Sequence, residues 1–180
     1  MGRHISWNIL SWNVQGLNSP GKHLAVRSLL SDKSYHIFYI QESKLASLDH
    51  SIVREFAPKR FDKFAFSPAS GASGGIVVGW ISSRFTGIVL SSNAFHLTIT
   101  FTTFVNGHQW ILTTVYGPCQ EPDKSLFLDW LKNLDLVAQK DWMFLGDFNL
   151  FRFPHNRTKR TGSYSYSHKF NDCINTQGLL

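Results

Sequence analysis

The chain has 180 residues, of which 43% are hydrophobic and 14% aromatic, a composition that supports one domain with a sizeable core and excludes a disordered chain. The formal net charge of +6 favours a polyanionic partner such as nucleic acid. No apolar run reaches the roughly 18 to 20 residues that cross a bilayer, and the N-terminal residues lack the apolar stretch of a signal peptide. We therefore expect an intracellular protein without membrane contact, in which Cys119 and Cys173 are free thiols.

Strands and helices alternate in the first third of the chain. In order, the expected elements are a strand over Ile5–Val14, a helix over Lys22–Leu30, a strand over Ile37–Ile40 and a helix over Leu45–Phe56. Leu24, Leu29 and Leu30 are expected to face inward from the first helix. The strands here are short and almost wholly apolar, which is typical of strands buried in an α/β protein.

The middle of the chain predicts β structure. The expected strands cover Ile76–Trp80, Phe85–Leu90, Phe95–Phe104 and Trp110–Tyr116, and the expected elements after them are a helix over Pro122–Gln139, a strand over Trp142–Leu145 and a helix over Ser165–Gln177. Residues 95–104 alternate between apolar and polar, as in a half-exposed antiparallel strand, and Asn106-Gly107 predicts a hairpin turn. Strand-helix-strand units at both ends with hairpins between them predict an α/β sandwich with a mixed sheet.

Polar side chains follow several of the apolar strands at the point where each strand ends. Asn13, Glu42 and Tyr116 each close one strand, and Asp147 and Asn149 close the strand before the last helix. Ligands of α/β sheets collect at the carboxyl ends of strands. In an extended chain Asp147 and Asn149 would face the same way.

These side chains match the requirements of metal-assisted phosphodiester hydrolysis. Glu42 suits a hard cation such as Mg²⁺, and the amide oxygen of Asn13 could join its ligands. Asp147 could take a proton from an attacking water that Asn149 orients, while the Tyr116 phenol could donate a hydrogen bond to a phosphoryl oxygen.

Each of these residues also has an ordinary structural interpretation. Aspartate and asparagine are common at strand-to-loop turns, where they bond their own backbone, so Asn13 and Asp147 could be turn residues. Glu42 could be a surface residue or a helix cap, and Tyr116 could be a core residue with its hydroxyl at the rim.

Basic residues are concentrated after the last predicted strand. The cluster consists of Arg152, Arg157, Lys159 and Arg160. It is either a solvated loop or a segment that contacts the phosphates of a nucleic acid.

Five motifs occur in an order and spacing that resemble the endonuclease/exonuclease/phosphatase superfamily. They are SWNVQGLNSP (11–20), IFYIQESKL (37–45), GASGGIVVGW (71–80), WILTTVYGP (110–118) and FLGDFNLFRFP (144–154). The resemblance spans essentially the whole chain and is nearest to the apurinic-type endonuclease domain of plant LINE-type (non-LTR) retrotransposons.

The resemblance implies a four-layer α/β sandwich of mixed sheets and a Mg²⁺-dependent endonuclease that nicks DNA, with Mn²⁺ as an alternative metal. It implies that Glu42 binds the metal, that Asn13 supports the metal and phosphate, and that Tyr116 contacts the phosphate. It implies further that Asp147 orients or deprotonates the attacking water and that Asn149 positions the water or the scissile phosphate. A reverse transcriptase region would be the partner in an intact element, and the nucleus the place of action.

One departure from the family pattern bears on activity. Such domains continue with further strands, another aspartate and a Ser-Asp-His motif, which this sequence does not contain. We therefore expect residues 1–180 to form a single domain in which the C-terminal part of the second sheet is missing and catalysis is impaired, since losing one preorganised donor costs on the order of 10² to 10³ in rate. The alternatives are a non-catalytic, retroelement-derived remnant that binds nucleic acid and, from the wider superfamily, a phosphoinositide or sphingolipid hydrolase.

Overall fold

The computed structural model describes residues 6–70, 73–136, 141–153 and 165–179, and these ranges contain eight strands and four helices. In chain order the elements are β1 (Asn8–Asn13), α1 (Pro20–Leu30), β2 (Tyr35–Gln41), α2 (His50–Phe56), β3 (Lys63–Ser70), β4 (Ser73–Trp80), β5 (Phe85–Ser92), β6 (His96–Thr103), β7 (Gln109–Tyr116), α3 (Asp123–Lys132), β8 (Asp141–Asp147) and α4 (Ser165–Gln177). Within the described ranges, no helix has the length and apolar character needed to cross a membrane.

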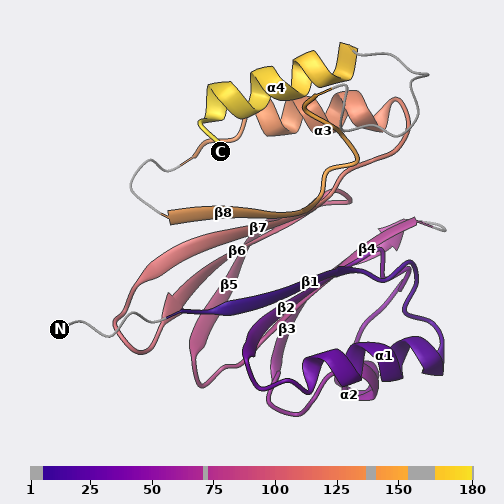
Figure 1. Ribbon diagram of the computed structural model, residues 1–180, viewed down its shortest axis with the longest axis vertical. Helices are drawn as coiled ribbons and strands as arrows, with labels where there is room; N and C mark the ends of the chain where they lie inside the picture. The colour runs from indigo at the N-terminus through magenta and orange to yellow at the C-terminus, as the bar shows by residue number, and fades with distance from the viewer. Residues whose placement is uncertain (1–5, 71–72, 137–140, 154–164, 180) are drawn as a thin grey trace.

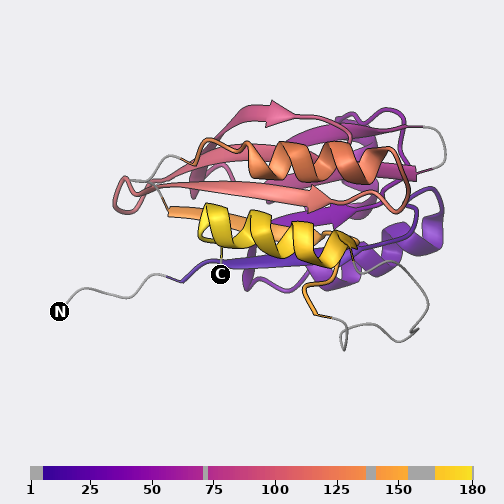
Figure 2. The same ribbon diagram turned by 90° about the horizontal axis from the view of Figure 1, so that it is seen from above.

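The strands form two mixed sheets that pack face to face. The first has the order β1-β2-β4-β3 and the second the order β5-β6-β7-β8. Each sheet has one parallel pair, β1 with β2 and β7 with β8, and its other pairs are antiparallel. Helices α1 and α2 cover the outside of the first sheet, and α3 and α4 lie side by side over the second (Figures 1 and 2). The predicted four-layer sandwich of mixed sheets is confirmed.

Three apolar clusters hold these layers together. The first fills the space between the sheets and includes Ile37, Ile99 and Leu112, all of which are buried. A second cluster lies between the first sheet and α1 and α2, and a third between α3, α4 and the chain after β8. Because strand side chains alternate, β2 contributes Tyr39 to the first cluster and Phe38 to the second.

Helix α4 has the predicted bounds, whereas the other three helices differ from the prediction in their length or in the face that they bury. Helix α1 buries Val26 and Leu30, whereas Leu24 is 67% and Leu29 43% exposed, so the predicted inward face is wrong for two of its three leucines. Its contact face follows the i, i+4 pair that lies over the first sheet.

The second and third helices were predicted too long at one end. Helix α2 begins only at His50 because the side chain of Asp49 accepts a hydrogen bond from the Ile52 amide at 3.0 Å and acts as the N-cap. Helix α3 ends at Lys132, where the carboxamide of Asn133 donates to the carbonyl of Asp129 at 2.7 Å.

Strand β6 is buried on both faces at its start, contrary to the prediction of a half-exposed strand. His96 and Thr98 are each 4% exposed. The His96 ring stacks on Trp130 of α3, with ring centroids 4.2 Å apart, and Thr98 bonds the hydroxyl of Thr113 at 2.9 Å. The hairpin after β6 is confirmed, with Gly107 at a φ of 68°.

A cavity of about 460 Å³ opens between the sheets at the end where β8 begins. Its lining includes Trp7, Trp110, Asp141 and Trp142. The ring nitrogen of Trp110 is buried there without a hydrogen-bond partner among the described residues. Packing between the sheets is therefore incomplete at this end.

Candidate functional site

The carboxyl ends of the two parallel strand pairs meet at the opposite end of the sandwich. Asn13 lies beside Gln41 in the first sheet, and Tyr116 lies beside Asp147 in the second. The amide of Asp147 donates to Oε1 of Gln41 at 2.8 Å, which joins the two strand ends across the sheets. The predicted convergence of Asn13, Glu42, Tyr116 and Asp147 at one end of the sheets agrees with this register.

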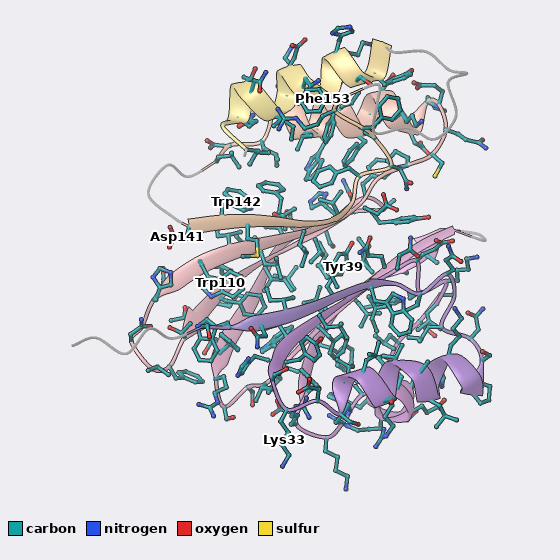
Figure 3. All side chains as sticks on the ribbon, viewed as in Figure 1. Lys33, Tyr39, Trp110, Asp141, Trp142 and Phe153 are labelled. Atoms are coloured by element: carbon teal, nitrogen blue, oxygen red, sulfur yellow. The ribbon has the colours of Figure 1, made fainter. Side chains whose placement is uncertain are left out.

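Two buried polar side chains of β2 tie the sheets together beside these residues. The Tyr39 hydroxyl donates to the carbonyl of Val115 at 2.6 Å, and the Gln41 carboxamide also donates to the Ser11 hydroxyl at 3.0 Å. Tyr39 lies between the sheets (Figure 3). Burial, followed by the negative charge of Asp147, raises the pKa of the Tyr39 phenol far above its usual value, so the phenol stays a donor.

Sequence reasoning missed the roles of Tyr39 and Gln41. The available signal was a phenol and a carboxamide at alternate positions of an otherwise apolar strand. Alternate positions of a strand face the same side, so both groups point into the space between the sheets. Both then need partners from the other sheet, because buried polar groups are costly when unpaired.

Glu42 is held in an uncommon backbone conformation directly after β2. Its φ is 53°, and Lys44 has a φ of 56°. The Lys44 ammonium lies 3.4 Å from Oε1 of Glu42, whose side chain is 18% exposed. Left-handed backbone at non-glycine residues costs on the order of 1 kcal/mol or more and often accompanies a functional site. Lys44 shows that this carboxylate already attracts a cation, and sequence reasoning gave Lys44 no role.

Tyr116 lies at the rim of the site with its phenol close to Glu42. Burial is the first cause that raises the pKa of Tyr116 to about 12, and the negative charge of Glu42 is the second. The phenol is therefore protonated at neutral pH and can donate a hydrogen bond to an anion.

Asp147 and Asn149 are adjacent, but the extended-chain argument for them is wrong. Asn149 has a φ of 50°, so the chain turns after β8. Its amide donates to Oδ1 of Asp147 at 2.9 Å, and its carboxamide donates to the carbonyl of Gly117 at 2.6 Å. Asn149 thus fixes the Asp147 carboxylate and joins the loops that follow β7 and β8. The turn interpretation of Asp147 and its proposed chemical role are compatible.

Two glycines allow these loops to approach closely. A Cβ on Gly146 would lie 2.0 Å from the carbonyl oxygen of Val115, and a Cβ on Gly117 would lie 2.0 Å from that of Phe148. Neither position can hold a larger residue without moving backbone, so both glycines are required for the loop spacing.

Asn13 closes β1 with its side chain turned partly to its own loop. Its Oδ1 accepts from the amide of Gln15 at 3.2 Å, as the turn interpretation predicts. A carbonyl oxygen has two lone pairs, so this bond leaves one acceptor site for a ligand.

The basic cluster is only partly within the described residues. Arg152 donates to Oδ1 of Asn171 in α4 at 2.9 Å, and Asn171 donates back to the Arg152 carbonyl at 2.6 Å. This arginine therefore anchors the last helix. Arg157, Lys159 and Arg160 lie outside the described residues.

The donor set suits Mg²⁺ better than a transition metal. No group of three or more histidine, cysteine, aspartate or glutamate side chains able to hold a metal occurs among the described residues. Mg²⁺ binds through one or two carboxylates and keeps several waters, which the Glu42 carboxylate with the Asn13 amide oxygen can accommodate.

No protein-family model matches the sequence, and neither does any curated protein. Solved structures do match. The AP endonuclease LMAP from Leishmania major superposes with a TM-score of 0.64 at 15% identity over 94% of this chain and 66% of that one. The endonuclease domain of TRAS1, a telomere-specific non-LTR retrotransposon, gives 0.67 at 15% identity over 96% and 72%. The human Nocturnin catalytic domain gives 0.62 at 14% identity over 88% and 67%.

These similarities establish the architecture of the molecule. The chain spans about two thirds of the length of each of these structures. At sequence identities of 14 to 15%, these similarities concern the fold alone. The chain has the fold of the endonuclease/exonuclease/phosphatase superfamily.

Proposed function

We propose that the chain hydrolyses DNA phosphodiester bonds as a Mg²⁺-dependent nicking endonuclease, with Mn²⁺ as an alternative metal. The observation that carries the proposal is the meeting of Glu42, Tyr116 and Asp147 at one end of the sandwich, held by the bond between Gln41 and the Asp147 amide. The fold supports it, because an AP endonuclease and a retrotransposon endonuclease domain share it.

Each side chain has a separate task in this reaction. Glu42, with the Asn13 amide oxygen, would hold the metal, which when bound neutralises phosphate charge and activates water. Asp147 accepts the proton of the water that attacks phosphorus, and Asn149 keeps the Asp147 carboxylate in place. Tyr116 donates a hydrogen bond from its phenol to a phosphoryl oxygen, while the P–O bond to the leaving sugar oxygen breaks and that oxygen takes up a proton from solvent.

The wider setting follows from the motifs and the charge. We propose that the domain belongs to a LINE-type element, acts on DNA in the nucleus and works with a reverse transcriptase region. The net charge of +6 supports a polyanionic substrate and counts against a lipid phosphoester. We also propose that catalysis by these 180 residues is slow, since the sequence contains no Ser-Asp-His motif to stabilise the developing charge on the phosphate.

A plasmid-nicking assay with and without Mg²⁺ tests the proposal. Glu42→Ala and Asp147→Ala should each abolish metal-dependent nicking. Asp141→Ala is the matched control, because Asp141 is a carboxylate at the other, exposed end of β8. Nicking that persists in both site variants would refute the assignment. If the unmodified chain binds DNA but does not nick it, the chain is a non-catalytic remnant.

A further inference from the structure

A cleft of about 580 Å³ lies directly beside Tyr116 and is distinct from the cavity at the other end of the sheets. Its walls include Phe95 before β6, Pro118 after β7 and Gly74 of β4, and Gln120 and Asp123 supply its polar groups. Since Tyr116 also belongs to the candidate site, a group in the cleft would be next to a phosphate held by Tyr116.

Single hydrogen bonds connect each wall of the cleft to the candidate site. The carbonyl of Gly74 accepts from the amide of Lys44, two residues after Glu42, at 3.1 Å. The carbonyl of Phe95 accepts from the Tyr116 amide at 2.9 Å. Gly117, next to Pro118, donates its amide to the carbonyl of Asp147 at 2.7 Å. The cleft is therefore rigidly placed relative to the phosphate-contacting residues.

The aromatic wall is held from behind. The Phe95 ring packs against Phe127 of α3 with centroids 5.9 Å apart, and the Phe95 amide donates to Oδ1 of Asn93 at 2.8 Å. The carbonyl of Asn93 in turn accepts from the Ser67 hydroxyl at 2.8 Å. One half-buried face of this ring is consequently presented at a fixed position.

The chemistry of the lining selects the ligand. Among the described residues that line the cleft, none is basic, so the cleft does not suit a second phosphate. A flat, uncharged group can stack on Phe95 and pack against Pro68 and Pro118, while the Asp123 carboxylate accepts hydrogen bonds from N–H donors. The Gln120 amide can both donate and accept hydrogen bonds at the edge of such a group. Carboxylates read the exocyclic amino groups of bases in this way.

We propose that the cleft binds an unpaired nucleobase carrying an exocyclic amino group, adjacent to the scissile phosphate. The proposal rests on the proposed nuclease function and adds to it a preference at one nucleotide position. We specify an unpaired base because a base within a duplex would first have to unpair and flip out of its stack, which costs free energy, before it could enter the cleft.

Cys119 reports on occupancy without requiring catalysis. It is an exposed thiol that lines the cleft, whereas Cys173 is buried and provides an internal control in the same chain. The rate of Cys119 alkylation is measured in EDTA with short single-stranded oligonucleotides, DNA and RNA, carrying 2-aminopurine, thymine or an abasic analogue at one central position. The 2-aminopurine strands should slow alkylation, and the abasic strands should not.

Variants separate base binding from general attraction to a polyanion. Asp123→Asn and Phe95→Ala should weaken protection by 2-aminopurine strands roughly tenfold in strand concentration, since loss of one stacking or hydrogen-bonding partner of a base has about this effect. Asp129→Asn removes the same charge from an exposed position of α3 outside the cleft and should leave protection unchanged. Asp123→Asn keeps the test valid if Phe95→Ala fails to fold.

Equal protection by abasic and 2-aminopurine strands would overturn the proposal, and so would protection that survives Asp123→Asn and Phe95→Ala. Base-dependent protection that is seen with DNA alone or with RNA alone would support the proposal and would identify which of the two supplies the base. The alkylation assay needs no metal, so base-dependent protection together with no nicking in the separate Mg²⁺ assay would refute the proposed catalysis while leaving the base site standing.

Discussion

Replacing Gln41 with methionine removes the polar link between the two halves of the site while keeping the size of the side chain. The substitution deletes the bonds to the Asp147 amide and the Ser11 hydroxyl. Each such bond contributes about 1 kcal/mol net, and the Asp147 amide left without its partner adds a desolvation cost of about 1 kcal/mol. We expect a loss of about 3 kcal/mol in the free energy of unfolding.

Urea unfolding followed by tryptophan fluorescence measures this loss, and Gln109→Met on the exposed start of β7 serves as the matched control. Ser11→Ala, alone and combined with Gln41→Met, separates the Ser11 bond from the Asp147 bond through a double-mutant cycle. Metal-dependent nicking, measured under native conditions, should also fall, because Gln41 positions the strand that carries Asp147. A loss below 1 kcal/mol together with unchanged nicking would refute the role of Gln41 as a link between the sheets.

Three further predictions concern charge and titration. Lys44→Ala should lower the Mg²⁺ concentration needed for half-maximal nicking, since the ammonium 3.4 Å from Glu42 competes for that carboxylate; an unchanged metal requirement would contradict this. Tyr116→Phe should reduce nicking by about 10², the usual effect of removing one donor to a developing oxyanion, and the unmodified chain should show no loss from phenol ionisation at pH 9 because the pKa of Tyr116 is raised to about 12. Burial lowers the pKa of His96 to about 4. The stability contributed by neutral His96 is therefore complete above pH 6.5 and is lost, by up to about 3 kcal/mol, as the pH falls toward 4. A urea midpoint of the wild-type chain that stays constant between pH 7 and 4.5, compared with that of His96→Gln, would argue against this prediction.

The α/β sandwich was predictable because most of its strands are short apolar runs with clear breaks, whereas its division into two sheets was implied only by the family resemblance. Strand β3 was missed: Lys63–Ser70 contains Pro68, which lowers strand propensity, and only pairing with β4 makes it a strand. The reverse error occurred in α2, where an apolar pattern with helical spacing continued past a cap that Asp49 supplies. Local spacing says which residues can share a face, and tertiary contacts decide which of those faces is used.

The candidate site was predictable to the extent that its residues end strands. Asn13, Glu42, Tyr116 and Asp147 could be grouped by that rule alone. The sequence could not show that Asn149 turns back onto Gly117, because a positive φ is set by the loop it closes. Lys44 was equally hidden, since its contact with Glu42 depends on a left-handed backbone at both residues, with Ser43 between them.

The hydrogen bonds of Tyr39, Gln41 and Ser67 all join the sheets at the end that carries the candidate site, whereas the cavity beside Trp110 lies at the other end. Thermal opening of the sandwich should therefore start at the cavity end and proceed along the strands. Amide hydrogen exchange in β8 should be faster near Trp142 than near Gly146. The catalytic geometry can then outlast fluctuations that already admit water to Trp110, so loss of activity on warming should follow, and not precede, the first change in tryptophan fluorescence.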